Sequence, residues 1–248
     1  METLMSGGVL MIPLCLCAIL SLAYILERAW VLSHIPNEEQ AQAALEEAER
    51  LLANDGEAAA ARHCQEGRGP LNFVFAALLK RFDTLMLERR EFRPTNQRLA
   101  RLAEGAGAGN LSQFLLQQKE LSDLKEELIL ETDEAGKTYL SRHLVVLNTI
   151  GNIAPLLGLF GTILGMISAF DAIAVAGTGD PKVVAGGISQ ALITTATGLA
   201  VAIPTIVAYR YLARRAEAQR GFLEVYGLAF VNTLLMAGQD QLEGEAAG

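Results

Sequence analysis

The chain contains three long apolar stretches without an acidic or basic residue, and these stretches set its architecture. The first covers residues 3–26, and the other two cover residues 144–170 and 183–209. The second and third stretches are each 27 residues long. At about 1.5 Å of rise per residue, a helix of that length exceeds the roughly 30 Å hydrocarbon core of a bilayer. The pattern therefore predicts three membrane-spanning helices, the last two of which form a hairpin.

The first apolar stretch has an alternative interpretation as a cleaved signal peptide, and two features argue against it. Arg28 is the first basic residue, so the positively charged region that begins a signal peptide is missing. The apolar run is also too long for the hydrophobic region of such a peptide. Residues 1–30 are therefore predicted to form the first transmembrane helix, with Trp30 at the membrane interface.

The polar remainder of the chain also reads as helical. Between residues 31 and 143, runs rich in Ala, Leu and Glu keep apolar residues at helical spacing, with breaks at residues 54–56 and 67–70. An apolar stripe continues into residues 210–248, where the final polar and small residues predict a disordered tail. The expected fold is an all-α polytopic membrane protein whose second and third transmembrane helices extend into a cytoplasmic helical bundle.

Basic residues flank the three spans mainly on one side of the membrane, and Lys182 is the single one in the linker on the other side. Those on the first side are Arg28, Lys137, Arg142, Arg210, Arg214, Arg215 and Arg220. The excess of Lys and Arg in cytoplasmic loops places these flanks in the cytoplasm. The N-terminus and the linker of residues 171–182 are then expected on the outer side, and the C-terminus in the cytoplasm.

Composition and charge exclude several classes of function. The chain is 51% hydrophobic and carries a net charge of −8, and it has no basic stripe of the kind that binds nucleic acid. Its three cysteines form neither a CxxC pair nor a cluster with histidine, so no zinc site, disulfide framework or cofactor is predicted. No nucleophile–base pair points to an enzyme.

A stripe of small residues runs along the second apolar stretch. Its members recur at intervals of three and four, and they include Gly151, Gly158, Gly161 and Gly165. In lipid, small residues allow two helix backbones to approach closely. We expect this stripe to pack against the third helix, where Gly187 and Gly198 offer similar space.

The third apolar stretch has a polar arc. At 100° per residue, Thr194, Thr197 and Thr205 fall within about 60° of Gln190, and Thr195 lies near 140°. Polar groups at membrane depth are costly unless they face protein or water. The arc therefore faces either neighbouring helices, through hydrogen bonds alone, or an aqueous path.

In the second stretch, Thr162 lies beside the glycine stripe. A lone threonine in a membrane helix most often donates to the carbonyl four residues earlier, so a structural role is the simplest interpretation. Neither this stretch nor the other two contains a carboxylate or a histidine, although proton relays through membranes are built from such groups. If the chain conducts protons, a partner must supply the titratable group. Asp171, just past the second stretch, is at most a group at the outer mouth.

The two segments APLLGLFGTILGMISAF and GGISQALITTATGLAVAIPTIVAYRYL resemble the MotA/TolQ/ExbB proton channel family, and most closely its ExbB/TolQ branch. The resemblance implies a subunit of a bacterial inner-membrane motor, with a periplasmic N-terminus. It implies a homo-oligomeric ring, usually of five such subunits, around an ExbD- or TolR-like partner with one membrane Asp. Proton flow would then energise a TonB- or TolA-like protein for outer-membrane transport or envelope maintenance.

The resemblance also implies roles for single residues. It places Thr162 and Thr195 in the lining of a proton pathway, where each could bind the partner's Asp in its neutral state. Gln190 stands where many members of the family have Glu, and we group it and Thr194 with the pathway. A non-conducting scaffold for an envelope complex is the alternative, and the glycine stripe fits both functions.

Overall fold

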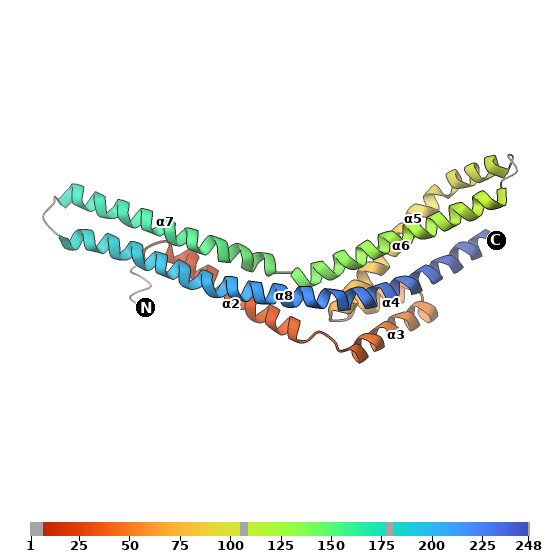
Figure 1. Cartoon of the computed structure of the whole chain (residues 1–248), viewed down its shortest axis with the longest axis horizontal. Coiled ribbons are helices and arrows are strands. Elements are labelled where there is room, and N and C mark those ends of the chain that lie inside the picture. The colour runs from red at the N-terminus through yellow and green to blue at the C-terminus, as the bar shows by residue number, and fades with distance from the viewer. Residues whose placement is uncertain (1–6, 105–108, 177–180, 248) are drawn as a thin grey trace. The chain divides into compact units, whose positions relative to one another are not determined.

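The structure, a computed structural model, describes residues 7–104, 109–176 and 181–247, and side chains over residues 7–89, 118–175 and 184–239. All regular secondary structure in these ranges is α-helical. The chain divides into two units (Figure 1). The first, which we call the membrane unit, comprises Met1–His34 and Ser141–Ala216, and the second comprises Ile35–Leu140 and Glu217–Gly248.

Helices α2 (Met11–Ser33) and α7 (Leu144–Ala176) belong to the membrane unit, together with the first part of α8 (Pro181–Ala247). The remainder of α8 belongs to the second unit. There it is joined by α3 (Glu38–Asp55), α4 (Glu57–Glu66), α5 (Pro70–Glu104) and almost all of α6 (Gly109–Ser141).

Three helical segments are long and apolar enough to cross a membrane. They are Met11–Ser33, Leu144–Val175 and Val184–Gln239. The prediction of an all-α protein with three spans is therefore confirmed within the described residues. The last segment has 56 residues, far more than the roughly 20 that cross a bilayer, so only its apolar first part is needed for the span.

Two helix ends differ from the sequence prediction. Helix α7 continues to Ala176, beyond the predicted end at residue 170, so Asp171 is helical rather than part of a linker. Helix α8 continues to Ala247, where a disordered tail was expected. Both extensions follow from cooperativity, because a helix that is already nucleated adds residues at little cost. The packing of Gly238 against Phe82 holds α8 near its end.

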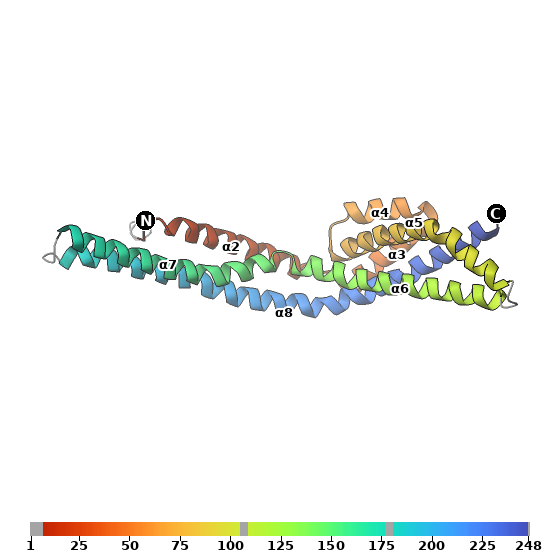
Figure 2. The same cartoon turned by 90° about the horizontal axis from the view of Figure 1, so that it is seen from above.

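The core of the membrane unit joins its three helices. Met11 and Leu14 of α2 pack with Ala154 of α7 and Ala202 of α8, all with at most 5% of their surface exposed. The alanines leave room for the longer side chains of α2 to insert between α7 and α8. Figure 2 shows α2 lying along α7. Helix α2 is thereby fixed against the hairpin at its N-terminal end.

A second contact holds the C-terminal end of α2. His143, between α6 and α7, has a left-handed backbone with φ of 62°. Its Nδ1 lies 3.0 Å from Oε2 of Glu27, and its ring lies 4.7 Å from that of Tyr24. Because His143 precedes Leu144, the first residue of α7, this contact holds the C-terminal end of α2 against the start of α7. Together with the core contact at Met11 and Leu14, it holds α2 at both ends.

The second unit is a helical bundle with an aromatic core. The rings of Phe75 in α5 and Phe230 in α8 lie 4.7 Å apart, and both side chains are fully buried. Gly227 of α8 lies against Thr132 of α6, which leaves no room for a side chain on the glycine. The bundle of α3, α4 and α5 beside the end of α8 can be followed in Figure 2.

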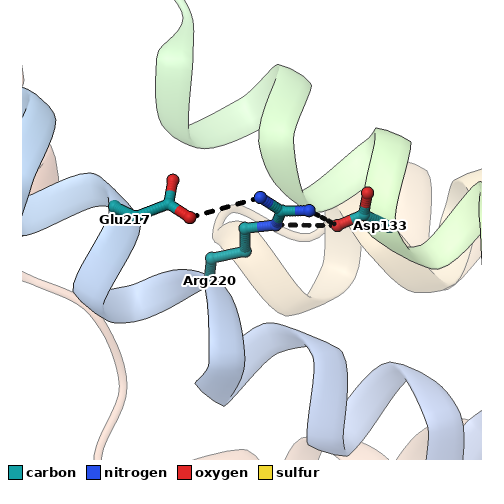
Figure 3. A network of polar contacts seen from close by, with 3 residues as sticks. All are labelled: Asp133, Glu217 and Arg220. Carbon is teal, nitrogen blue, oxygen red and sulfur yellow. Dashed lines mark hydrogen bonds and ion pairs between the residues drawn. The ribbon is translucent and has the colours of Figure 1, made fainter.

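A polar network also links α6 and α8 in the second unit. Arg220 donates from Nε and Nη2 to Oδ1 of Asp133, at 2.7 and 2.5 Å, and from Nη1 to Glu217 at 3.2 Å (Figure 3). Asp133 lies on a different helix from Arg220, whereas Glu217 lies one turn away on the same helix. Only the pair with Asp133 can therefore hold two elements together.

We expect Asp133→Asn to lower the thermal midpoint of the chain in detergent by no more than a few degrees, since the three side chains are partly exposed and screened by water. Glu217→Gln is the matched control, because it removes an exposed ion pair within a single helix. The midpoints are measured by circular dichroism at low and high salt. A shift of the midpoint for Asp133→Asn that persists at 1 M salt would show that the effect is not electrostatic. An equal shift for Glu217→Gln would show that the Arg220–Asp133 pair has no special role in holding α6 and α8 together.

Candidate functional site

The backbones of α7 and α8 touch in the middle of the membrane unit. A Cβ atom added to Gly198 would lie 2.6 Å from the carbonyl oxygen of Ala154, and one added to Gly158 would lie 3.1 Å from Cα of Thr195. Distances under 3.0 Å are not reached by real Cβ atoms, so glycine is required at residue 198. The two helices cross here backbone to backbone.

The same close approach extends in both directions from this crossing. Towards the hairpin end, a Cβ on Gly165 would lie 2.8 Å from Cβ of Ala191, and one on Gly187 would lie 2.8 Å from the carbonyl oxygen of Gly165. Towards the other end, a Cβ on Gly151 would lie 2.6 Å from Ile206. The structure thus places the glycines that the sequence analysis selected along one continuous interface.

Thr195 and Thr162 donate to two successive carbonyls of α7 at this interface. The hydroxyl of Thr195 donates to the carbonyl oxygen of Gly158 at 2.9 Å. In an α-helix that same carbonyl accepts the backbone N–H of residue 162. The hydroxyl of Thr162 donates to the carbonyl of Leu159 at 2.6 Å, three residues earlier and not the four expected. Thr162 therefore lies one turn from Gly158 on α7, and Thr195 contacts Gly158 from α8.

The other threonines in the apolar stretch of α8 donate to backbone carbonyls of this chain. Thr194 is fully buried, and its Oγ1 lies 2.9 Å from the carbonyl oxygen of Gly7 and 2.8 Å from that of Gln190. Thr197 and Thr205 donate to carbonyls of their own helix. The four predicted pathway residues thus differ in their contacts. Thr162 and Thr195 donate to carbonyls of α7, whereas Gln190 lies beside the segment before α2. Thr194 contacts both, since its hydroxyl reaches Gly7 and its side chain packs against Gly161 of α7.

The hydroxyl geometry limits what the site can do chemically. A threonine hydroxyl has one hydrogen and two lone pairs. In Thr162 and Thr195 the hydrogen is held by a backbone carbonyl, so toward a further group each oxygen can only accept. The apolar stretches carry no carboxylate and no histidine. The site can orient and stabilise a proton-carrying group, and it cannot itself bind and release the proton.

Groups that could serve other chemistry are sparse in the described part of the chain. No cluster of three or more His, Cys, Asp or Glu that could hold a metal ion occurs there. Asp171 is exposed on the last turns of α7. In the second unit, burial raises the pKa of the Cys64 thiol to about 11, so this thiol is neutral and unreactive at neutral pH.

The sequence analysis did not predict the contact between α8 and the segment that precedes α2. Gly8 has φ of +72°, and the amide of Gln190 occupies the space where a side chain on Gly8 would stand. The adjacent glycines at positions 7 and 8 were the only signal. Glycine at the start of a helix has several uses, so that signal does not identify a partner on another helix.

Comparison with known proteins gives a family match. Residues 101–224, half of the chain, match the MotA/TolQ/ExbB proton channel family. The chain is 40% identical to the biopolymer transport protein ExbB of Salmonella typhimurium over 102 residues. These residues make up 41% of each protein. It is 45% identical over 78 residues to ExbB of Helicobacter pylori, covering 32% of this chain and 54% of that protein.

A relative with a different name is similar to the chain at about the same level of sequence identity. The Tol-Pal system protein TolQ of Pseudomonas aeruginosa is 41% identical over 78 residues, which is 32% of this chain and 34% of that protein. The chain thus spans about two fifths of the length of the Salmonella relative and about a third of the Pseudomonas one.

We expect Gly198→Ala to destabilise the hairpin by about 1–3 kcal/mol, the usual cost of overpacking, because its Cβ would meet the carbonyl of Ala154. Gly186→Ala is the control on the same helix, since nothing lies within 4 Å of its Cβ position. Unfolding in mixed micelles with increasing dodecyl sulfate measures both variants. Equal unfolding curves for the two would show that the α7–α8 contact does not depend on this glycine.

Proposed function

Since the chain belongs to the MotA/TolQ/ExbB proton channel family, we propose that it is a motor subunit of a bacterial inner-membrane complex that conducts protons. In this proposal the complex uses the proton motive force to energise a TonB- or TolA-like protein, for transport across the outer membrane or for envelope maintenance. The names ExbB and TolQ of the relatives support these two roles equally. The N-terminus faces the periplasm and the C-terminus the cytoplasm.

The observation that carries the proposal is the pair of hydroxyls on the successive carbonyls of Gly158 and Leu159. Both lie at the α7–α8 crossing inside the uncharged stretches, and neither can carry a proton by itself. A pathway through this subunit therefore needs a titratable group from a second protein. An ExbD- or TolR-like protein with one membrane Asp, enclosed by a homo-oligomeric ring such as a pentamer, supplies that group.

The direction of the hydrogen bonds gives this proposal a mechanism. A protonated carboxyl donates one hydrogen bond, and the oxygens of Thr162 and Thr195 are free to accept it. An ionised carboxylate only accepts, and these two hydroxyl hydrogens are already held by carbonyls. Hydrogen bonding to the neutral form alone raises the pKa of an acid. The site thus holds the partner's Asp while it is protonated and releases it on ionisation.

This selectivity couples proton transfer to motion. Loss of the proton removes the hydrogen bond and leaves a charge in a poorly hydrated site, which is unfavourable at membrane depth. The partner helix then moves until its acid meets water or another protonation site. A non-conducting scaffold would need only the glycine interface, and it would be indifferent to the two hydroxyls.

We expect Thr162→Val and Thr195→Val each to reduce proton-dependent uptake or envelope function by about five- to thirteenfold while the complex still assembles. The reason is the loss of one hydrogen bond to the neutral acid, worth about 1–1.5 kcal/mol per site. Uptake of a TonB-dependent substrate, detergent sensitivity of the envelope and native gel electrophoresis of the complex are measured together.

Thr195→Ser and Thr197→Val serve as controls for that experiment. Serine keeps the hydroxyl that donates to Gly158, and Thr197 donates only to Ile193 of its own helix. Both variants should retain function. Full activity of the valine variants at positions 162 and 195 would support the scaffold and end the proton-pathway assignment.

A further inference from the structure

The backbone before α2 forms a turn that we call the N-terminal turn, residues 7–10. Gly8 has a left-handed backbone with φ of +72°. The carbonyl oxygens of Gly8, Val9 and Leu10 accept the first amides of α2, at 3.1 to 3.3 Å. The carbonyl of Gly7 lies before this pattern and accepts no hydrogen bond from an amide of α2.

This turn lies at membrane depth. Its neighbour Thr194 is also the residue that a side chain on Gly161 of α7 would overlap. Positions 161 and 194 are both well inside the uncharged stretches of residues 144–170 and 183–209. Non-helical backbone at this depth is tolerated only where protein satisfies its polar groups. The carbonyl of Gly7 therefore needs a donor from another element.

Thr194 is that donor. Its Oγ1 lies 2.9 Å from the carbonyl oxygen of Gly7, a residue 187 positions away in the chain, and its side chain has no exposed surface. Its single hydrogen is shared with the carbonyl of Gln190 at 2.8 Å. Thr205, equally buried, donates only to Val201 of its own helix. Thr194 and Thr205 are thus equally buried on the same helix, but of the two only Thr194 bonds to another element.

Gln190 completes the contact. A Cβ on Gly8 would overlap Nε2 of Gln190 and would lie 3.2 Å from its Cδ and 3.8 Å from its Cγ. The amide of Gln190 thus lies across the face of Gly8. The positive φ favours glycine at position 8, and a side chain there would also have to displace the amide of Gln190. Glutamine makes this contact without a charge, whereas a carboxylate here would be ionisable against buried backbone.

We propose that Gln190 and Thr194 form a docking site for the N-terminal turn, and that Gly8 is the residue that positions the turn there. The docked turn covers this part of the polar arc of α8. A consequence that rests on the proposed function is that the proton path runs beside Thr162 and Thr195. Gln190 and Thr194 then lie outside that path. The Gln in place of the family's common Glu is then a docking residue and not a disabled proton group.

Hydrogen–deuterium exchange of the peptide covering residues 7–14 tests the docking, with the full-length chain in lipid nanodiscs. Exchange here requires the turn to detach. Thr194→Val should raise the exchange rate about tenfold, the effect of losing one buried hydrogen bond. Thr205→Val should leave it unchanged, and Thr194→Ser should restore the slow exchange. Equal exchange for the Thr194→Val and Thr205→Val variants would overturn the proposal.

A double-mutant cycle tests the second contact. Gly8→Ala adds backbone strain in any background, but it overlaps the amide only when Gln190 is present. Its effect on the exchange rate should therefore be at least about fivefold smaller in the Gln190→Ala background, since neighbouring residues couple. Independent, multiplicative effects of the two substitutions would show that Gln190 does not hold the turn.

The two proposals fail separately. Thr162→Val should leave exchange of residues 7–14 unchanged, because Thr162 donates only to Leu159 of its own helix. If the valine variants at positions 162 and 195 keep proton-dependent activity, the proposed function fails and the docking stands. If exchange is indifferent to Thr194 and Gln190, the docking fails and the proposed function stands.

Discussion

The absence of water in the hydrocarbon core is the constraint on which the membrane unit depends. Every polar group there must find a partner within protein. The threonine hydroxyls of α8 meet this requirement by donating to carbonyls, either of α8 itself or, for Thr194 and Thr195, of other segments. Close helix contact through glycine makes the second kind of bond possible, since a side chain on Gly158 would push Thr195 away from its acceptor.

This constraint also explains why the polar arc of α8 is larger than helix packing alone requires. Part of it satisfies the irregular backbone before α2, where Thr194 supplies the donor that Gly7 needs. Another part lies at the α7–α8 crossing, where Thr195 donates to the carbonyl of Gly158. Neighbouring threonines of one helix thus satisfy backbone carbonyls of two different segments.

The three spans could be predicted because uncharged stretches longer than a bilayer have few alternatives. The glycine stripe could also be predicted from the sequence, since intervals of three and four place residues on one helix face. The ends of α7 and α8 were not, because helix propagation continues until something stops it, and composition alone does not show where packing such as that of Gly238 resumes. The contact of Gln190 with Gly8 depends on where α2 begins relative to α8, and no local pattern records that relation.

The carbonyl of Gly158 accepts both the hydroxyl of Thr195 and, by helix geometry, the amide of residue 162. A carbonyl with two donors vibrates at a lower frequency than its singly bonded neighbours. An isotope-edited infrared label at this one peptide group would therefore report, without any bulky probe, whether the hydroxyl turns away from the backbone when a partner's acid arrives. Because a side chain on Gly158 would press on the backbone of Thr195, the native glycine is itself the least disturbing reporter at the crossing.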